Sequence, residues 1–206
     1  MSNELGGVVH LVDDEEPVRD ALAFLLGSRG LEVHCYDSGP AFLQSLQNLK
    51  GGQPLHGVIV LDVRMEPMSG LRVHTELVAR GVRNPVMFLS GHGDIPMAVE
   101  ALKNGAFDFI EKPYSDNALA ERVEQALRVE SAMRERNAGE AERTARMASL
   151  TEREREVMQR VAAGKLNKVI ADELGIAVRT VEVHRARVFS KLGVRSAAEL
   201  ATVLLK

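Results

Sequence analysis

The sequence of 206 residues has a single cysteine and no long apolar run. One thiol excludes an internal disulfide and a cysteine metal cluster, and we interpret Cys35 as a small buried side chain on a strand. No apolar stretch reaches the length of a membrane span, and the first residues lack the basic and apolar regions of a signal peptide. We therefore expect a cytoplasmic protein with no membrane partner.

The net charge of −3 is small because two parts of opposite charge nearly cancel. Residues 1–127 carry 10 basic and 18 acidic side chains, whereas residues 151–206 carry 11 basic and 7 acidic ones. Such an asymmetry indicates different partners for the two parts, and only the basic C-terminal part suits nucleic acid.

Residues 8–127 alternate short apolar runs with segments of helical periodicity. We predict strands near 8–12, 32–36, 57–62, 85–89 and 107–110, and helices near 16–28, 39–50, 70–80, 95–104 and 115–135. Five units of this kind predict an α/β, flavodoxin-like, doubly wound parallel sheet, because parallel neighbours need crossover connections. A strand order of 2-1-3-4-5 opens a ligand crevice between the first and third strands.

Polar residues follow four of the apolar runs. The run 58–61 ends on Asp62, although an aspartate in this position also commonly begins a turn. The other runs end in the same way, on Asp13 and Asp14, on Ser90 and, after the fifth, on Lys112. Because the carboxyl ends of parallel strands line one crevice, we expect these side chains to converge.

The residue types in this crevice favour phosphoryl chemistry. Three carboxylates repel one another unless they share a proton or bind a cation, and a set of oxygen ligands without thiolate favours Mg²⁺ or Mn²⁺. A lysine and a hydroxyl would contact phosphoryl oxygens. Together they predict that Asp62 attacks phosphorus and forms an aspartyl phosphate.

Segments at all of these positions resemble the receiver domain of two-component response regulators, in particular the FixJ class. They are Asp13 and Asp14, LDVRM (61–65), SGHGDIPMAV (90–99) and GAFDFIEKP (105–113). The resemblance implies that Asp62 accepts phosphate from a sensor histidine kinase, and that Asp13, Asp14, Asp62 and the carbonyl of Arg64 hold Mg²⁺. It also implies that Ser90 and Lys112 contact the phosphoryl oxygens, and that the Lys112–Pro113 bond is cis.

Two positions leave alternatives open. Phe109 matches the aromatic switch position of receivers, but an ordinary core aromatic on the last strand is an equal reading. Glu66 and Pro67 depart from the pattern, in which proline usually comes one place earlier. The carboxylate of Glu66 could tune cation binding or dephosphorylation, or face solvent, and we favour solvent.

Residues 128–148 have alternating charges and few large apolar side chains. This pattern predicts a solvated helical linker that continues from the preceding helix and is interrupted near Asn137 and Gly139. The apolar heptad positions of a dimeric coiled coil are absent from its sequence.

From Ser149 onward the periodicity is that of short helices only. Thr151 and Glu154 fit a capping box, and Gly175 separates a helix of about eight residues from a longer one, as in a helix-turn-helix. Three-helix bundles without a DNA function share this periodicity. The segments LTEREREV (150–157), NKVIA (167–171) and RTVEVH (179–184) resemble the LuxR/NarL-type effector domain over residues 149–206.

The longer helix is amphipathic, with Val181, Val188 and Leu192 on its buried stripe. Its outer face presents candidate base contacts, which are Arg179, Glu182, Val183, Ala186 and Ser190. Candidate phosphate contacts are Lys168, Thr180, Arg185, Arg187 and Lys191. We interpret His184 as a packing residue.

We therefore predict a receiver over 1–127, a linker over 128–148 and a DNA-binding domain over 149–206. Phosphorylation of Asp62 would favour dimerisation through a face around residues 94–110, and paired effector domains would bind promoter DNA. RNA polymerase is a further expected partner. We expect no enzyme beyond self-phosphorylation and slow dephosphorylation. The rivals are a small-molecule phosphatase or phosphotransferase, and a regulator that has lost phosphotransfer.

Overall fold

The computed structural model describes residues 7–48, 54–91 and 95–205, and it divides the chain into two compact units, residues 1–134 and 135–206. Three residues of the 90–99 segment, His92, Gly93 and Asp94, lie outside the described residues, as do the last two residues of the helix predicted for 39–50. Within the described part of the chain, no helix is both long enough and apolar enough to cross a membrane.

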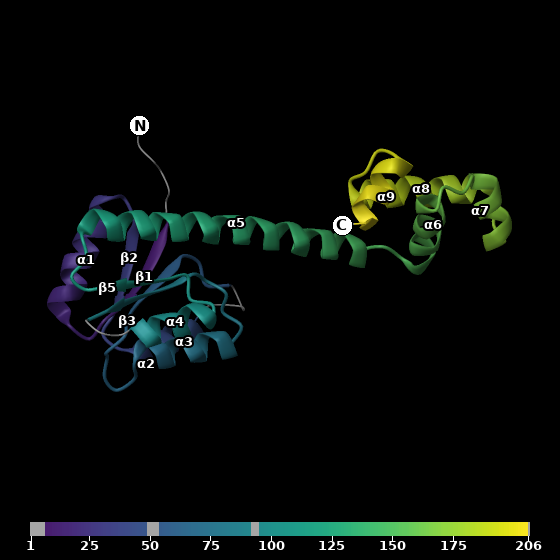
Figure 1. Cartoon of the computed structure of the whole chain (residues 1–206). Coiled ribbons are helices and arrows are strands. Elements are labelled where there is room, and N and C mark those ends of the chain that lie inside the picture. Colours follow the sequence, from purple (N-terminus) through teal and green to yellow (C-terminus); the bar gives the residue numbers. More distant parts are fainter. Residues whose placement is uncertain (1–6, 49–53, 92–94, 206) are drawn as a thin grey trace. The chain divides into compact units, whose positions relative to one another are not determined.

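The first unit contains a five-stranded parallel sheet (Figure 1). Its strands are β1 (Val8–Val12), β2 (Glu32–Tyr36), β3 (Val58–Asp62), β4 (Val86–Ser90) and β5 (Asp108–Glu111). The strand order is β2-β1-β3-β4-β5, which confirms the predicted winding. Every residue of β3 and β4 is buried, because helices cover both faces of the central strands.

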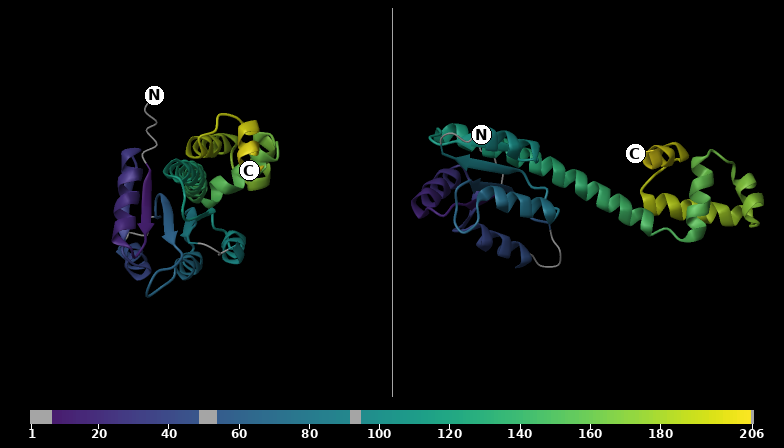
Figure 2. Two further views of the ribbon diagram at one scale, coloured as in Figure 1. Left: turned by 60° about the vertical axis from the view of Figure 1, so that its left-hand side comes forward. Right: turned by 60° about the horizontal axis from the view of Figure 1, so that its bottom comes forward.

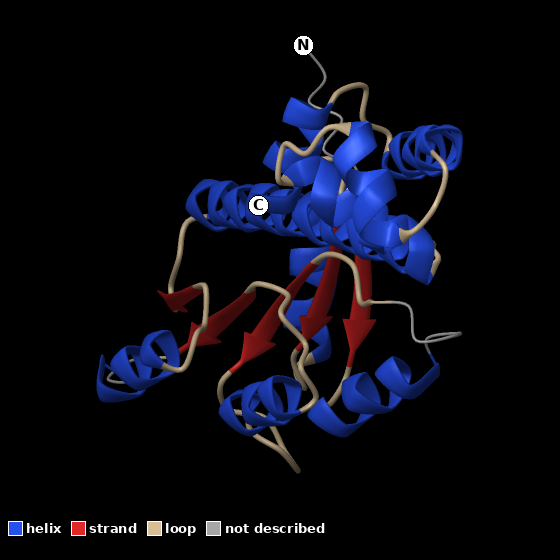
Figure 3. Cartoon of the chain, turned by 90° about the vertical axis from the view of Figure 1, so that its right-hand side faces the viewer, coloured by secondary structure: helices blue, strands red, loops and turns tan. Residues whose placement is uncertain are grey.

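Helices lie on both faces of this sheet (Figures 1 and 3). They are α1 (Glu16–Ser28), α2 (Gly39–Ser45) followed by the 3₁₀ turn η1 (Leu46–Asn48), α3 (Gly70–Ala79), α4 (Ile95–Lys103) and α5 (Asp116–Ala148). Val58 and Val60 pack in a core with residues of α1 and α5, whereas Ile59 and Leu61 pack in a second core with residues of α2 and α3. Because successive side chains of a strand point to opposite faces of the sheet, the residues of β3 contribute alternately to the two cores.

Two expectations for this part of the chain are wrong. Cys35 is exposed, because β2 is an edge strand whose outer part is only partly covered by helices. The helix α5 continues through Asn137 and Gly139 without interruption (Figure 2). Ion pairs one turn apart, Arg136 with Glu140 and Arg146 with Glu142, support this exposed helix.

The second unit contains the end of α5 and four short helices, α6 (Glu152–Ala162), α7 (Asn167–Leu174), α8 (Val178–Leu192) and α9 (Ala197–Leu205). Both halves of the predicted capping box, Thr151 and Glu154, are formed at the start of α6. Gly175 and Gly193 end α7 and α8 with φ of 63° and 67°, a left-handed conformation that glycine adopts without steric cost. The predicted apolar stripe of α8, Val181, Val188 and Leu192, is buried in a core that includes Val157, Ile170 and Leu200.

Candidate functional site

The register of the sheet brings the polar residues at the strand ends together. Asp62, the last residue of β3, pairs with Leu89 of β4, so Ser90 extends one residue beyond it. The amide of Lys112 donates to the carbonyl of Ser90 at 2.6 Å, which ties the end of β5 to the end of β4. Asp13 follows β1, and its amide donates to the carbonyl of Tyr36 at 3.2 Å.

An ion-paired cluster of three residues forms at this edge. Lys112 Nζ lies 2.6 Å from Asp62 Oδ1 and 3.4 Å from Asp13 Oδ2. The side chain of Asp13 is 1% exposed and that of Lys112 is 24% exposed, so solvent screens their interaction little. Residues separated by up to 99 positions in sequence are therefore neighbours in one partly open cluster.

Burial and pairing act in opposite directions on these charges. Burial raises the pKa of Asp13 above its ordinary value, although the amide of Glu15 and the Lys112 ammonium both favour its charged form. Burial disfavours the Lys112 ammonium, but its hydrogen bond to Asp62 and the charges of Asp62 and Asp13 outweigh that effect and raise the pKa of Lys112. The lysine is thus held as a cation against the two carboxylates.

The carboxylate of Asp62 is oriented through both of its oxygens. Lys112 donates to Oδ1, and the amide of Arg64 donates to Oδ2 at 2.6 Å. The chain then returns close to the strand, since a Cβ built on Gly70 would lie 2.1 Å from the carbonyl oxygen of Asp62. Glycine at the start of α3 is what permits this close approach.

Asp14 occupies a more exposed position than Asp13. Its Oδ2 accepts a hydrogen bond of 3.4 Å from the amide of Glu66. The side chain of Glu66 is exposed, as we favoured from the sequence, and the bond from Glu66 to Pro67 is cis. The cis bond expected between Lys112 and Pro113 is confirmed.

The donor set fits a hard divalent cation. Within the described ranges no three acidic, histidine or cysteine side chains are gathered as a ready metal site, and Lys112 lies between the carboxylates of Asp13 and Asp62. Magnesium, however, is commonly bound by one or two carboxylates, with water and phosphate completing the shell. Burial of Asp13, which raises its pKa, also leaves a carboxylate that a cation would stabilise.

Ser90 ends β4, whereas Phe109 lies two pairs further back along the sheet, where it pairs with Phe88. The Ser90 side chain is buried, and its hydroxyl donates to the carbonyl of Gly91 at 3.2 Å. The half-buried ring of Phe109 lies 6.1 Å from that of Phe88, which in turn lies 5.6 Å from the buried His74 of α3. Our sequence reading missed His74, and the apolar spacing of α3 was the only signal that it faces the core.

The predicted DNA-binding residues divide into two groups in the structure. Those that are exposed are Lys168, Arg179, Thr180, Glu182, Val183, Ala186, Arg187 and Ser190. Arg185 instead donates to Asn167 Oδ1 at 2.9 Å and stacks 5.2 Å over the ring of Phe189. Lys191 lies 2.6 Å from Glu154 Oε2 and also donates to the carbonyl of Ser149. These two cations therefore have structural partners.

His184 lies between the exposed and the buried sides of α8. Its Nδ1 is buried and has no hydrogen-bond partner in the described structure. This position agrees with our interpretation of His184 as a packing residue. The sequence did not reveal the contacts that Asn167 and Glu154 make with α8, because both residues belong to helix starts, where capping is the usual reason for such side chains.

Comparisons with known proteins match the N-terminal and the C-terminal part of the chain to two different families. Residues 9–124 match the response regulator receiver domain, and residues 148–204 match the bacterial regulatory proteins of the luxR family. The C4-dicarboxylate transport transcriptional regulatory protein DctR of Rhodobacter capsulatus is 48% identical over 198 residues, which are 94% of this chain and 96% of DctR.

Solved structures of full-length regulators are also similar. The structure of the response regulator StyR is 40% identical, covers 96% of this chain and 98% of its own, and has a TM-score of 0.87. That of full-length FixJ from B. japonicum is 40% identical, covers 97% and 96%, and has a TM-score of 0.58. This chain therefore belongs to the two-component response regulators that join a receiver domain to a LuxR-family DNA-binding domain.

Proposed function

We propose that Asp62 accepts a phosphoryl group from a sensor histidine kinase and thereby controls promoter binding. One observation carries the proposal: the Lys112 ammonium bridges the buried carboxylates of Asp62 and Asp13 at the carboxyl end of the sheet. A nucleophilic carboxylate beside a fixed cation is suited to phosphoryl transfer, which depends on positioning and charge stabilisation. On this proposal residues 1–127 are the receiver, 128–148 the linker and 149–206 the DNA-binding domain.

The chain's own residues have separate tasks in the transfer. An oxygen of Asp62 attacks phosphorus, while the bond from phosphorus to the donor atom breaks and its electron pair stays with the donor. Lys112 moves from Oδ1 to an oxygen of the transferred group, and the Ser90 hydroxyl donates to another. The amide of Arg64 continues to hold Oδ2. Phe109 repacks when Ser90 moves.

Asp13, Asp14, Asp62 and the carbonyl of Arg64 would hold Mg²⁺, or Mn²⁺ in its place. When bound, the cation neutralises charge that accumulates on the phosphoryl oxygens. The carboxylates of Asp13 and Asp62 both contact the Lys112 ammonium. The space between these two carboxylates therefore favours a positive charge. Asp14 would join through its exposed carboxylate.

Phosphorylation would be read out as dimerisation. On α4, Val99 and Leu102 expose 47% and 46% of their surface, and α4 packs next to β5, which carries Phe109. An exposed apolar pair beside the switch residue supports this face as the one that pairs two copies. Two linked effector domains then bind paired half-sites with a raised effective concentration.

The effector domain would bind double-stranded promoter DNA through α8 and communicate with RNA polymerase. Arg179, Glu182, Val183, Ala186 and Ser190 would meet base edges in the major groove. Lys168, Thr180 and Arg187 would contact phosphates. Arg185 and Lys191, which have partners inside the domain, would support the helix rather than contact DNA. We propose no turnover of an external substrate.

Incubation with Mg²⁺ and acetyl phosphate tests the central proposal. We expect one phosphoryl group per chain by intact mass, together with a shift to dimer, and the loss of both in Asp62→Asn. Asp20→Asn, which removes an exposed aspartate on α1, is the matched control and should keep both responses.

Other outcomes would overturn the proposal. Labelling that persists in Asp62→Asn would assign the phosphoryl group to another residue. Many turnovers per chain without a stable label would favour a phosphatase, and an unchanged oligomeric state after beryllofluoride treatment would favour a regulator that has lost phosphotransfer.

A further inference from the structure

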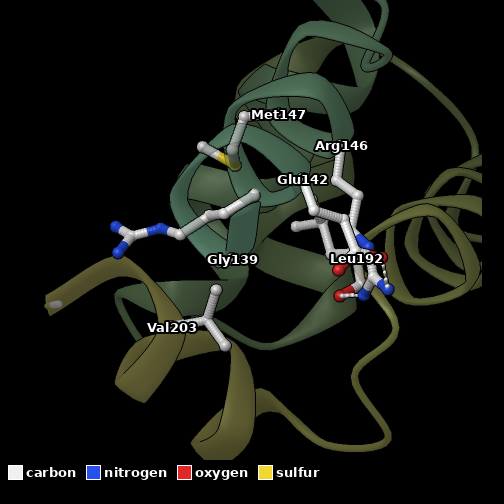
Figure 4. Close-up of a pocket in the computed structure, with 7 residues that line it drawn as sticks. Gly139, Glu142, Arg146, Met147, Leu192 and Val203 are labelled. Carbon is white, nitrogen blue, oxygen red and sulfur yellow. Dashed lines mark hydrogen bonds and ion pairs between the residues drawn. The ribbon is translucent and has the colours of Figure 1, made fainter. Parts of the chain in front are cut away.

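A cavity of about 210 Å³, about half open to solvent, lies in the second unit between the end of α5 and the helices α8 and α9. Figure 4 shows Val203 of α9 reaching toward the part of α5 that carries Gly139 and Met147, with Leu192 of α8 at the side. This cavity shares no residue with the cluster around Asp62 and none with the exposed face of α8. Neither the phosphoryl chemistry nor DNA binding accounts for it.

Apolar side chains and a missing side chain shape the interior. Met147, Leu192 and Val203 line the cavity, and each also belongs to or packs against the apolar core of the domain. Gly139 contributes no side chain, and a Cβ built on it would meet no atom within 4 Å. The volume therefore depends in part on glycine at this turn of α5.

The two arginines on the cavity wall differ in their partners. Arg146 pairs with Glu142 at 2.7 Å and donates to the carbonyl of Leu192 at 3.3 Å, so its guanidinium is committed (Figure 4). Arg143 is half-buried, and within the described residues it has neither an ion pair nor a hydrogen bond. An uncommitted guanidinium beside an apolar wall presents a fork of donors suited to a carboxylate.

We propose that this cavity binds a small organic carboxylate with a compact apolar body. Its carboxylate would pair with Arg143, and its body would lie on Met147, Leu192 and Val203. The volume is below the range of pockets for drug-sized ligands, which limits the ligand to a small ring or a short branched chain. A ligand in this place contacts α5 and α9 together and stabilises the junction between them.

Binding of benzoate and of neutral benzamide to the full-length protein tests this proposal. The two probes have the same ring but differ in charge, and saturation-transfer NMR with competition titrations gives both dissociation constants. We expect benzoate to bind about tenfold more tightly, because a hydrogen bond to a charged partner adds about 1.5 kcal/mol. Equal affinity of the two probes would overturn the assignment of Arg143.

Three variants locate the site. Arg143→Gln should abolish the preference for benzoate while leaving benzamide binding unchanged, and Gly139→Leu should abolish binding of both probes by filling the cavity. Arg134→Gln, an exposed arginine on the same helix outside the cavity, is the matched control and should change neither.

The proposal fails if Arg143→Gln retains the tenfold preference, or if Arg134→Gln removes it. It also fails if a folded Gly139→Leu still binds both probes with unchanged affinity. Because Arg143→Gln alters only a partly exposed side chain, its result stands even where Gly139→Leu does not fold. Phosphorylation of Asp62 is not needed for any of these readouts.

Discussion

At the residue scale, the buried carboxylate that a lysine meets decides what the lysine does. Lys112 and Lys191 each come one polar residue after a pair of large apolar residues, Phe109 and Ile110 or Val188 and Phe189. Lys112 meets Asp62 and Asp13 at a partly open edge, whereas Lys191 meets the buried Glu154 at the start of α6. In the proposed function Lys112 would exchange a carboxylate partner for a phosphoryl group, whereas Lys191 and Glu154 hold two helices of one core together.

Glu154 gives the effector domain a pH-dependent stability. Its hydrogen bond to Lys191, together with the one from the amide of Thr151, lowers the pKa of Glu154 to about 2. Because the folded-state pKa lies below the ordinary value of 4.5, the stabilisation is complete above pH 4.5 and disappears as the pH falls to about 2. Urea titrations of the NMR signals of residues 152–162 at several pH values measure this loss.

The variant Glu154→Gln isolates that contribution. At pH 7 it should lower the free energy of unfolding of the effector domain by about 1 kcal/mol or more, because the capping box loses its charged partner. The difference from the unmodified protein should vanish near pH 2. Glu152 lies two residues before Glu154 and is exposed, so Glu152→Gln should keep the pH dependence, and loss of that dependence in this control would refute the assignment.

At the scale of elements, α5 is a helix that changes its surroundings along its length. Leu119, Ala120 and Val123 are buried in the receiver core, whereas residues 134–142 are exposed, and of these Gly139 and Glu142 lie at the wall of the cavity in the second unit. A polar helix without tertiary packing depends on propensity and on ion pairs one turn apart. Gly139 is the weakest helix former in this stretch.

Replacing Gly139 should therefore strengthen the middle of α5. Gly139→Ala adds a Cβ that meets no atom within 4 Å, so we expect about 1 kcal/mol of local stabilisation. Hydrogen exchange of residues 135–145 should slow by about fivefold. The control Gly27→Ala, in α1, also adds an unobstructed Cβ and should leave exchange in α5 unchanged.

The helices α7 and α8 permit a test that separates phosphate contacts, at Lys168 of α7 and Arg187 of α8, from structural cations. Lys168 and Arg187 are exposed and have no ion-pair partner in the described parts of the chain. Lys168→Ala and Arg187→Ala should each reduce the slope of log affinity against log salt by about 0.9, for every DNA sequence tested. Lys191→Ala should instead lower effector stability, because it leaves Glu154 buried without its partner.

Charge removal outside the effector domain is the control for that test. Arg134→Ala, on α5, should leave the salt slope unchanged, since it lies outside the proposed DNA-binding surface. An equal change of slope in Arg134→Ala would mean that the affinity follows total charge rather than particular contacts. The preference for one DNA sequence over another should change only when a proposed base contact is replaced, as in Glu182→Ala, and not when a phosphate contact is replaced.

At the scale of the whole molecule, the proposed response to phosphorylation would require two copies of the chain. Val99→Asp and Leu102→Asp should each weaken the dimer of the beryllofluoride-treated protein by roughly tenfold, because a charge would be buried in the paired face. Sedimentation at several concentrations measures the dissociation constant. Val78→Asp, at an α3 valine that is 54% exposed, is the matched control, and an equal loss there would contradict the assigned face.

Much of the receiver followed from local patterns and one topological rule. Short strand-like stretches predicted all five strands within one residue, and the rule that parallel strand ends share one edge predicted that Asp62, Asp13 and Lys112 meet. The exposure of Cys35 did not follow, because a residue on an edge strand has the same neighbours in sequence as one on a central strand.

The sequence alone determined the two-part organisation, the alternation of strands and helices in the first unit, the capped start of α6 and the buried stripe of α8, since each of these depends on the spacing of residue types. The tertiary structure alone decided that Lys191 meets Glu154, that Arg185 meets Asn167, and that α5 runs unbroken past Gly139. The partners of Arg185 and Lys191 lie on other helices of the domain, and the spacing of residues within each helix does not determine how those helices pack against one another.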